Sequence, residues 1–301
     1  MSTLKDTNSA KIAAEFVRSR KAAGSPAMGM VMTLIIVVPE DAAHDAMQAA
    51  REAATEHPAR VLGVILGDGR GVPVVNAEVA TGQGWTGETA LIRLRGEVVK
   101  HADSVVLPLL LPDSPVAIWW PVDPPSDPAS DPLGSLAQRR ITDAASVTRG
   151  KTTALIDQCT QYSPGNTDLA WTRITAWRAL LAAALDQLPE KVTSASVAAE
   201  RISPSADLLA EWLAARLKVR VERHTTDGPG ITEAVLVTKK GPIRISRADG
   251  ALATFSSPGR PDRPIALKRR DIPHLLAEEL RHLDEDDVYA EVAKRLAKAP
   301  K

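Results

Sequence analysis

The stretch Met30–Val38, MVMTLIIVV, constrains the fold of this chain more than any other. An almost unbroken apolar and β-branched run predicts a strand buried on both faces, as in a parallel sheet. The Ala-rich segment that follows, up to Glu56, predicts a helix with Glu40 and Asp41 at the positive end of its dipole. Val61–Leu66, VLGVIL, predicts a second buried strand. This order of elements indicates a β-α-β unit with parallel strands.

Further elements extend this first region. The hydrophobic pattern predicts a helix at Ser9–Arg20 and strands at Val74–Thr81, Thr89–Val99 and Val116–Trp120. His101–Leu111 is expected to be either a helix broken near Pro108 or an extended apolar segment. In the helix after the first strand, Ala43, Met47, Ala50 and Ala54 form a narrow stripe of packing residues. The glycine-rich turn Gly82–Gly87 contains Trp85, which is expected to be either a lid or a packing anchor.

The second half of the chain has a different pattern. Asp168 is a good N-cap for a long helix, Leu169–Leu188, and Ser203-Pro204 begins another helix. Strands are predicted at residues 219–224, 233–238, 243–246 and 252–255, followed by helices at Asp271–Leu283 and Asp284–Ala299. We therefore expect an α/β protein of two domains. Residues 1–162 form an α/β sheet domain, and residues 163–301 form an α+β domain with helices flanking a small, mostly antiparallel sheet.

Length and charge limit the functional classes. A chain of 301 residues exceeds the usual size of one domain. Its 37 basic and 37 acidic residues cancel, so charge gives no reason to expect nucleic acid or an anionic membrane as a partner. The apolar runs are too short to span a bilayer, and no targeting signal is visible. With a single Cys, the chain is expected in the reducing cytoplasm.

The motifs that resemble catalytic or ligand sites are incomplete. Gly150-Lys151-Thr152 resembles the end of a phosphate-binding loop, but Ala145 stands where that motif needs glycine. The stretch Gly67–Gly71 follows a strand but precedes another strand, so no helix N-terminus would face a phosphate. None of the 6 His pairs at metal-ligand spacing, and Cys159 has no CxxC partner. These motifs therefore predict no catalytic, cofactor or metal site, and any enzymatic activity would not be visible in the sequence.

A basic stretch between Lys239 and Arg270 contains only Asp249 and Asp262 as acidic residues. Such a surface can hold an anionic ligand or an acidic partner. The candidate anion-binding residues are Arg244, Arg247, Lys268 and Arg269. The alternative is a solvated face balanced by the acidic run Asp284–Asp287.

Two adjacent Trp residues, Trp119 and Trp120, precede a loop rich in proline and aspartate. Neighbouring side chains on a strand point to opposite faces, so one core cannot easily bury both rings. We expect one ring to close the N-terminal core and the other to pack under or beside the loop from Pro121 to Arg140. The alternative is that the second ring anchors a partner protein, as Trp often does at the centre of an interface.

Four stretches in order carry a resemblance to a known family. They are MVMTLIIVV, PLLLPDSPVAIWWP, DPLGSLAQRRITDA and DLAWTRITAWRALLAAALD. Together they resemble the glucose-6-phosphate dehydrogenase assembly protein family, OpcA, from about Asp6 to Leu296. The resemblance implies a non-catalytic accessory subunit that activates glucose-6-phosphate dehydrogenase, the enzyme of the NADP-reducing first step of the oxidative pentose phosphate pathway. Cyanobacterial members are tied to thioredoxin-controlled cysteines, and this chain departs from them because it has only Cys159.

The resemblance makes the dehydrogenase the expected partner. If the second Trp ring anchors a partner, the Trp-containing region is the contact. The candidate partner-binding residues are Trp119, Trp120, Asp127, Asp131, Arg139, Arg140 and Asp143. One alternative function is a sensor or enzyme that binds a sugar phosphate or nucleotide on the basic face of the second domain. A nucleic-acid binder that uses the same face would show a steep salt dependence, but Phe255 is the only aromatic residue in the basic stretch.

Overall fold

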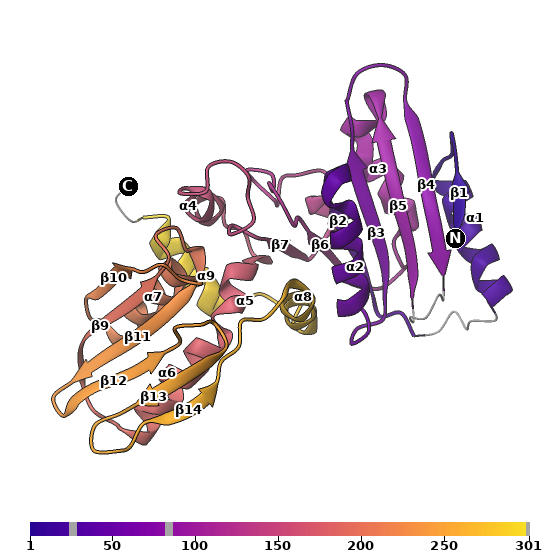
Figure 1. Cartoon of the computed structure of the whole chain (residues 1–301). Coiled ribbons are helices and arrows are strands. Elements are labelled where there is room, and N and C mark those ends of the chain that lie inside the picture. The colour runs from indigo at the N-terminus through magenta and orange to yellow at the C-terminus, as the bar shows by residue number, and fades with distance from the viewer. Residues whose placement is uncertain (24–28, 82–86, 299–301) are drawn as a thin grey trace. The chain divides into compact units, whose positions relative to one another are not determined.

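The computed structural model describes residues 1–23, 29–81 and 87–298 of the chain (Figure 1). Contacts between residues divide the chain into two units. Unit 1 consists of Met1–Thr148, Ser163–Thr167 and Ile272–Asp286. Unit 2 consists of Arg149–Tyr162, Asp168–Asp271 and Asp287–Lys301. The units interleave along the sequence. The single domain boundary after residue 162 that is expected from the sequence stays a prediction.

Unit 1 is built on a mixed sheet of eight strands in the order β1-β4-β5-β3-β2-β6-β7-β8. The strands are β1 (Ser2–Leu4), β2 (Met32–Val37), β3 (Ala59–Leu66), β4 (Val74–Thr81), β5 (Glu88–Arg95), β6 (Val116–Trp119), β7 (Arg139–Thr142) and β8 (Asn166–Asp168). The central strand β2 pairs in parallel with both β3 and β6, which confirms the predicted β-α-β unit. β4 pairs antiparallel with β5 and β1.

The helices of unit 1 cover both faces of this sheet. They are α1 (Ser9–Ala23), α2 (Ala43–Ala53), α3 (Ala102–Val106) and α8 (Ile272–Arg281). The predicted stripe of α2 is buried, and α2 packs against α8. At Gly63 of β3, an added Cβ would lie 2.6 Å from the sulfur of Met47, so the glycine allows α2 to approach the sheet. On the other face, Phe16 of α1 and Val106 of α3 share a core cluster with Leu62.

Unit 2 contains a sheet of six strands in the order β10-β9-β11-β12-β13-β14. The strands are β9 (Val192–Ala199), β10 (Val221–Thr225), β11 (Ile231–Thr238), β12 (Gly241–Ser246), β13 (Leu252–Ser256) and β14 (Arg263–Ala266). Its helices are α4 (Ala154–Thr160), α5 (Leu169–Arg173), α6 (Thr175–Gln187), α7 (Pro204–Leu217) and α9 (Asp287–Leu296). Only β9 and β10 pair in parallel, so the sheet is mostly antiparallel, as expected.

The main correction concerns the long helix predicted at Leu169–Leu188. The chain leaves the helical conformation at Ile174, whose φ is −97° and ψ is 2°. The amide of Ile174 donates to Trp171 O at 3.1 Å, three residues back along the chain instead of the four of an α-helix, so the turn is tighter there. The helix α6 then begins at Thr175. Asp168 is an N-cap as predicted, and its carboxylate accepts from the amide of Ala170.

Trp85, in the predicted glycine-rich turn, lies outside the described residues, so its role as a lid or a packing anchor stays a prediction. No helix in the described part of the chain is long and apolar enough to cross a membrane.

Candidate partner-binding site

Trp119, the last residue of β6, lies on the sheet face that α2 covers. It is in register with Ile36 of β2, which is in register with Gly63 of β3. Paired residues of neighbouring strands point to the same face, and the face at Gly63 carries Met47 of α2. The indole of Trp119 is 2% exposed, and within the described structure its Nε1 atom has no hydrogen-bond partner.

Trp120 lies on the opposite face, in the core cluster that contains Leu109, Leu133 and Ala137. A Cβ placed on Gly134 would lie 3.1 Å from Cη2 of Trp120, so the backbone of the following loop rests against the ring. Its side chain is 3% exposed. The two rings are therefore buried on opposite faces, one in the sheet core and one under the loop, as the sequence predicts. Direct contact of either ring with a partner stays a prediction.

Aspartate side chains hold the loop after Trp120 in a fixed shape. Asp127 Oδ1 accepts hydrogen bonds from the amides of Ala129 and Ser130, at 3.0 and 3.2 Å. Asp131 Oδ1 accepts from the amides of Leu133 and Gly134, both at 3.0 Å. Hydrogen bonding by Ser130 lowers the pKa of Asp127 below its ordinary value. These carboxylates replace backbone hydrogen bonds that a loop cannot make for itself.

Arg140 and Asp143 also bond within unit 1. Arg140 donates to Asn166 Oδ1 and to Ala137 O, each at 2.6 Å, and to Pro164 O. Asp143 is buried and accepts from the hydroxyl of Ser146 at 2.8 Å. Both residues thus join the end of the loop to neighbouring backbone. Their predicted place in the polar rim of an interface is not tested by this geometry.

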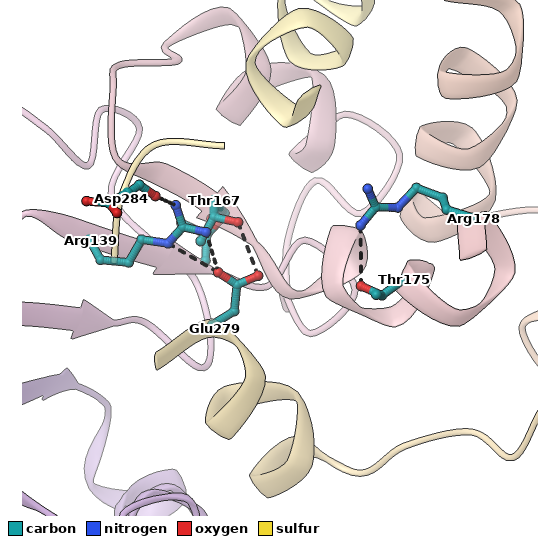
Figure 2. Close-up of polar contacts among 7 residues, drawn as sticks. Arg139, Thr167, Thr175, Arg178, Glu279 and Asp284 are labelled. Carbon is teal, nitrogen blue, oxygen red and sulfur yellow. Dashed lines mark hydrogen bonds and ion pairs between the residues drawn. The ribbon is translucent and has the colours of Figure 1, made fainter. Parts of the chain in front are cut away.

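Arg139 forms a buried ion pair that the sequence analysis did not identify. Its Nη2 lies 2.6 Å from Glu279 Oε2 on α8, its Nε donates to the same oxygen at 3.2 Å, and its Nη1 donates to Asp284 O at 2.9 Å (Figure 2). Thr167 Oγ1 lies 3.5 Å from the other carboxylate oxygen of Glu279. Arg139 and Glu279 are only 4% and 5% exposed.

A sequence signal for this pair does exist on α8. Glu279 stands between Leu276 and Leu280 on the buried side of that helix. A carboxylate on an apolar helix face needs a partner, because an unpaired buried charge is costly. That signal predicts that some cation faces Glu279, but it does not identify which of the chain's arginines it is.

The structure does not bring the four candidate anion-binding residues to one surface. Arg244 is exposed on β12 and pairs with Glu233 at 2.9 Å, while Lys268 and Arg269 are exposed after β14. Arg247 is 5% exposed and donates to Leu267 O and Ile231 O, at 2.8 and 3.0 Å. Anion binding by this set stays a prediction.

The guanidinium of Arg247 lies in an unusual environment for a cation. It is 5.1 Å from the centre of the Trp177 ring, and in the described structure no carboxylate lies within ion-pair distance of it. Burial, together with the positive charge of Arg269, lowers the pKa of Arg247 to about 10. Its role in the fold is to join the carbonyl of Ile231, at the start of β11, to the carbonyl of Leu267, directly after β14.

In the part of the chain that the structure describes, the side chains that could bind a metal ion or react as a thiol do not form a site. There, no three His, Cys, Asp or Glu side chains form a group that could hold a metal ion. Cys159 is buried on α4, and burial, with a contribution from Asp168, raises the pKa of its thiol to about 12. The thiolate is the reactive form, so this environment opposes reaction of the cysteine.

Comparison with known families gives two matches, one in each half of the chain. Residues 50–159 match the model of the N-terminal domain of the glucose-6-phosphate dehydrogenase subunit. Residues 164–293 match the model of the C-terminal domain of the same subunit. No curated protein matches the chain.

Solved structures are similar only at a distance. The 3-ketoreductase KijD10 from Actinomadura kijaniata has a TM-score of 0.43 and 9% identity, over 88% of this chain and 94% of that one. An E. coli structure described as trehalose-6-phosphate bound with UDP-2-fluoro glucose has a TM-score of 0.28 and 12% identity, over 65% of each chain. These values are too low to support any statement about function.

Proposed function

This chain belongs to the glucose-6-phosphate dehydrogenase assembly (OpcA) family, and from that premise we propose that it is a non-catalytic accessory subunit of the dehydrogenase. It binds the enzyme and raises its activity. In that role it supports the NADP-reducing first step of the oxidative pentose phosphate pathway in the cytoplasm. The observation that carries this proposal is that the models of both domains of the family match in their expected order along the chain.

We place the contact with the dehydrogenase on the loop between Trp120 and Arg139. Hydrogen bonds that Asp127 and Asp131 accept from backbone amides of the loop fix its shape before a partner binds. A preformed loop loses little conformational entropy on association, which favours binding. Trp119 and Trp120 support the contact indirectly, because their buried rings hold the end of β6 and the loop in place. Arg139, Arg140 and Asp143 fix the point at which the loop ends.

The activating role is tested with the purified dehydrogenase, glucose 6-phosphate and NADP. We expect no NADPH formation by this chain alone, and an increase in the dehydrogenase rate that saturates as the chain is added. Measurements across chain and substrate concentrations separate a change in kcat from a change in KM. Dehydrogenase kinetics that are identical with and without the chain would overturn the proposal.

The contact surface is tested separately from the stability of the loop. Ser126 is exposed in the loop, so Ser126→Arg adds bulk and charge there without removing a core contact. We expect this variant to unfold at the wild-type temperature and to bind the dehydrogenase at least tenfold more weakly. Val72→Arg, at a residue that is 80% exposed outside the loop, is the matched control and should bind normally.

The two Trp residues provide the complementary measurement. Because both rings are buried, Trp119→Ala and Trp120→Ala should each lower the unfolding free energy by about 3–5 kcal/mol. We expect each variant to lose binding only in proportion to the fraction that unfolds. A Trp variant with normal unfolding that fails to bind would show instead that its ring contacts the partner directly.

A further inference from the structure

Unit 2 contains a pocket of about 490 Å³ between α4, α7, β10 and the end of α9. This volume is within the range of small-molecule sites, which is roughly 300–1,000 Å³. Part of its lining is apolar and comes from four separate elements. These apolar residues are Leu155, Ile156, Ala210, Ala214, Val221 and Leu296. A ligand in this pocket can therefore bury an apolar body.

The charged lining of the pocket is unbalanced. Its cations are Lys151, Arg201 and Arg223, and its carboxylates are Asp207 and Glu211. Each carboxylate already has a partner.

Asp207 pairs with Arg223 at 2.9 Å, and Glu211 pairs with Arg295 of α9. Lys151 and Arg201 form no ion pair with any residue that the structure describes. The pocket thus keeps two positive charges that no protein carboxylate neutralises.

We propose that this pocket binds a phosphate monoester with an apolar or aromatic body. A phosphate monoester carries a charge of about −1.5 to −2 at neutral pH, which matches the two uncompensated cations. Ammonium and guanidinium groups both bind phosphate oxygens through charge-assisted hydrogen bonds. The apolar lining favours an aromatic or hydrocarbon body over a bare sugar.

This site differs from the phosphate sites considered in the sequence. Gly150-Lys151-Thr152 lacks the glycine-rich loop that would surround a phosphate with backbone amides, but it places the side chain of Lys151 on the pocket. The phosphate contacts therefore come from side chains. The cations are also different from those of the basic stretch Lys239–Arg270. The inference does not rest on the proposed activation of the dehydrogenase.

Binding is tested on the full chain alone, by calorimetry with phenyl phosphate as the probe. Inorganic phosphate provides the charge without the apolar body, and phenol provides the body without the charge. We expect phenyl phosphate to bind at least tenfold more tightly than either. Affinity for phenyl phosphate that is equal to that for inorganic phosphate, or no heat of binding up to about 10 mM, would overturn the proposal.

Variants locate the binding site. The double variant Lys151→Glu/Arg201→Glu changes exposed side chains, so it should fold normally and lose phenyl phosphate affinity at least tenfold. Lys239→Glu/Arg260→Glu makes the same change in charge at exposed positions of unit 2 outside the pocket and should bind as wild type. Equal losses in both double variants would mean nonspecific attraction to a positively charged unit, and the pocket would not be the site.

A variant that preserves the charges tests the apolar part. Ala214→Phe places a ring in the pocket while Lys151 and Arg201 remain. We expect this variant to lose phenyl phosphate binding at least fivefold and to keep the weak binding of inorganic phosphate. Phenyl phosphate affinity that is unchanged in Ala214→Phe would contradict a ligand body in this pocket.

Discussion

Two buried arginines, one in each unit, have opposite surroundings. In unit 1, Arg139 faces the Glu279 carboxylate at 2.6 Å, so opposite charges are buried together. In unit 2, Arg247 is bound by backbone carbonyls and an indole ring, and burial lowers its pKa to about 10. The first arginine depends on one side chain, which a single substitution can remove. The hydrogen bonds of the second go to backbone carbonyls, which no side-chain substitution at those positions removes.

This difference shows where each unit is vulnerable. A buried ion pair is only weak evidence for net stability, because burying the two charges costs about as much as their attraction returns. Removing one partner is nevertheless severe, since the other charge is left buried and unpaired. In unit 1 the sensitive residue is therefore Glu279, which lies far along the chain from Arg139. In unit 2 it is Arg247 itself, since two carbonyls depend on it.

The largest effect is expected for Glu279→Leu. This variant leaves Arg139 buried without a carboxylate and should lower the unfolding free energy by about 3–5 kcal/mol. The measurement is urea unfolding followed by Trp fluorescence. Glu285→Leu, at an exposed residue close to the same helix, is the control and should change stability by less than about 0.5 kcal/mol.

A double variant distinguishes two causes of destabilisation, the unpaired charge of Arg139 and the loss of side-chain packing. Arg139→Met/Glu279→Leu removes both charges and keeps much of the buried volume. We expect it to be more stable than Glu279→Leu alone, because no charge remains unpaired. If the double variant is as unstable as the sum of the two single variants, the carboxylate acts through something other than Arg139.

An intermediate effect is expected for Arg247→Lys. An ammonium group cannot reach both carbonyls as the guanidinium does, so we expect a loss of about 1–3 kcal/mol at neutral pH. Burial should also depress the pKa of the new lysine. The folded chain then binds fewer protons than the unfolded chain, and stability rises with pH up to the usual lysine value of ~10.4.

The readout is the unfolding free energy of Arg247→Lys at about pH 7 and pH 9.5, relative to wild type. A deficit that shrinks at the higher pH confirms that the site disfavours charge. A deficit that is equal at both values would mean that the lysine escapes to solvent. Arg244→Lys, on the exposed side of β12, should show no pH-dependent difference.

The smallest effect is expected for Cys159, a buried thiol that stays neutral and so needs neither a carboxylate, as Arg139 does, nor backbone carbonyls, as Arg247 does. With its pKa raised to about 12, the Cys159 thiol should not react with a thiol-specific dye in the native chain, and should react fully in urea. Activation of the dehydrogenase should be equal under reducing and oxidising conditions, for wild type and for Cys159→Ser. Loss of wild-type activity on oxidation, prevented in Cys159→Ser, would identify a redox site.

The parallel core of unit 1 is predictable from the sequence, whereas the strand β9 of unit 2 is not. The continuous apolar run at β2 is a strong signal because that strand is buried on both faces, and the alternation in β5 is strong because deeper and shallower burial alternate from Ala90 to Arg95. The strand β9, VTSASVAA, lies between β10 and β11 in its sheet but contains mostly small or polar residues. Small side chains give little contrast between faces, so its place in the sheet comes from tertiary packing.

The burial of the two Trp rings was predictable from the sequence, but the contacts of the two buried arginines were not. Adjacent Trp residues before a loop of prolines and aspartates indicate correctly that the two rings lie on opposite faces. The pairing of Arg139 with Glu279 joins residues 140 positions apart, and no local pattern carries that information. The same is true of Arg247, whose basic neighbours suggest a surface while the residue itself is buried.

The interleaving of the two units has a consequence for how the chain is made. Unit 1 includes α8, which packs against α2 and supplies Glu279 to Arg139. A ribosome that has just produced Thr148 must still add most of unit 2 before α8 emerges. At about 5–20 residues per second, this delay is roughly six to thirty seconds. During that interval the nascent chain carries an uncovered α2 surface and an arginine without its carboxylate, a state in which chaperones would be expected to bind it.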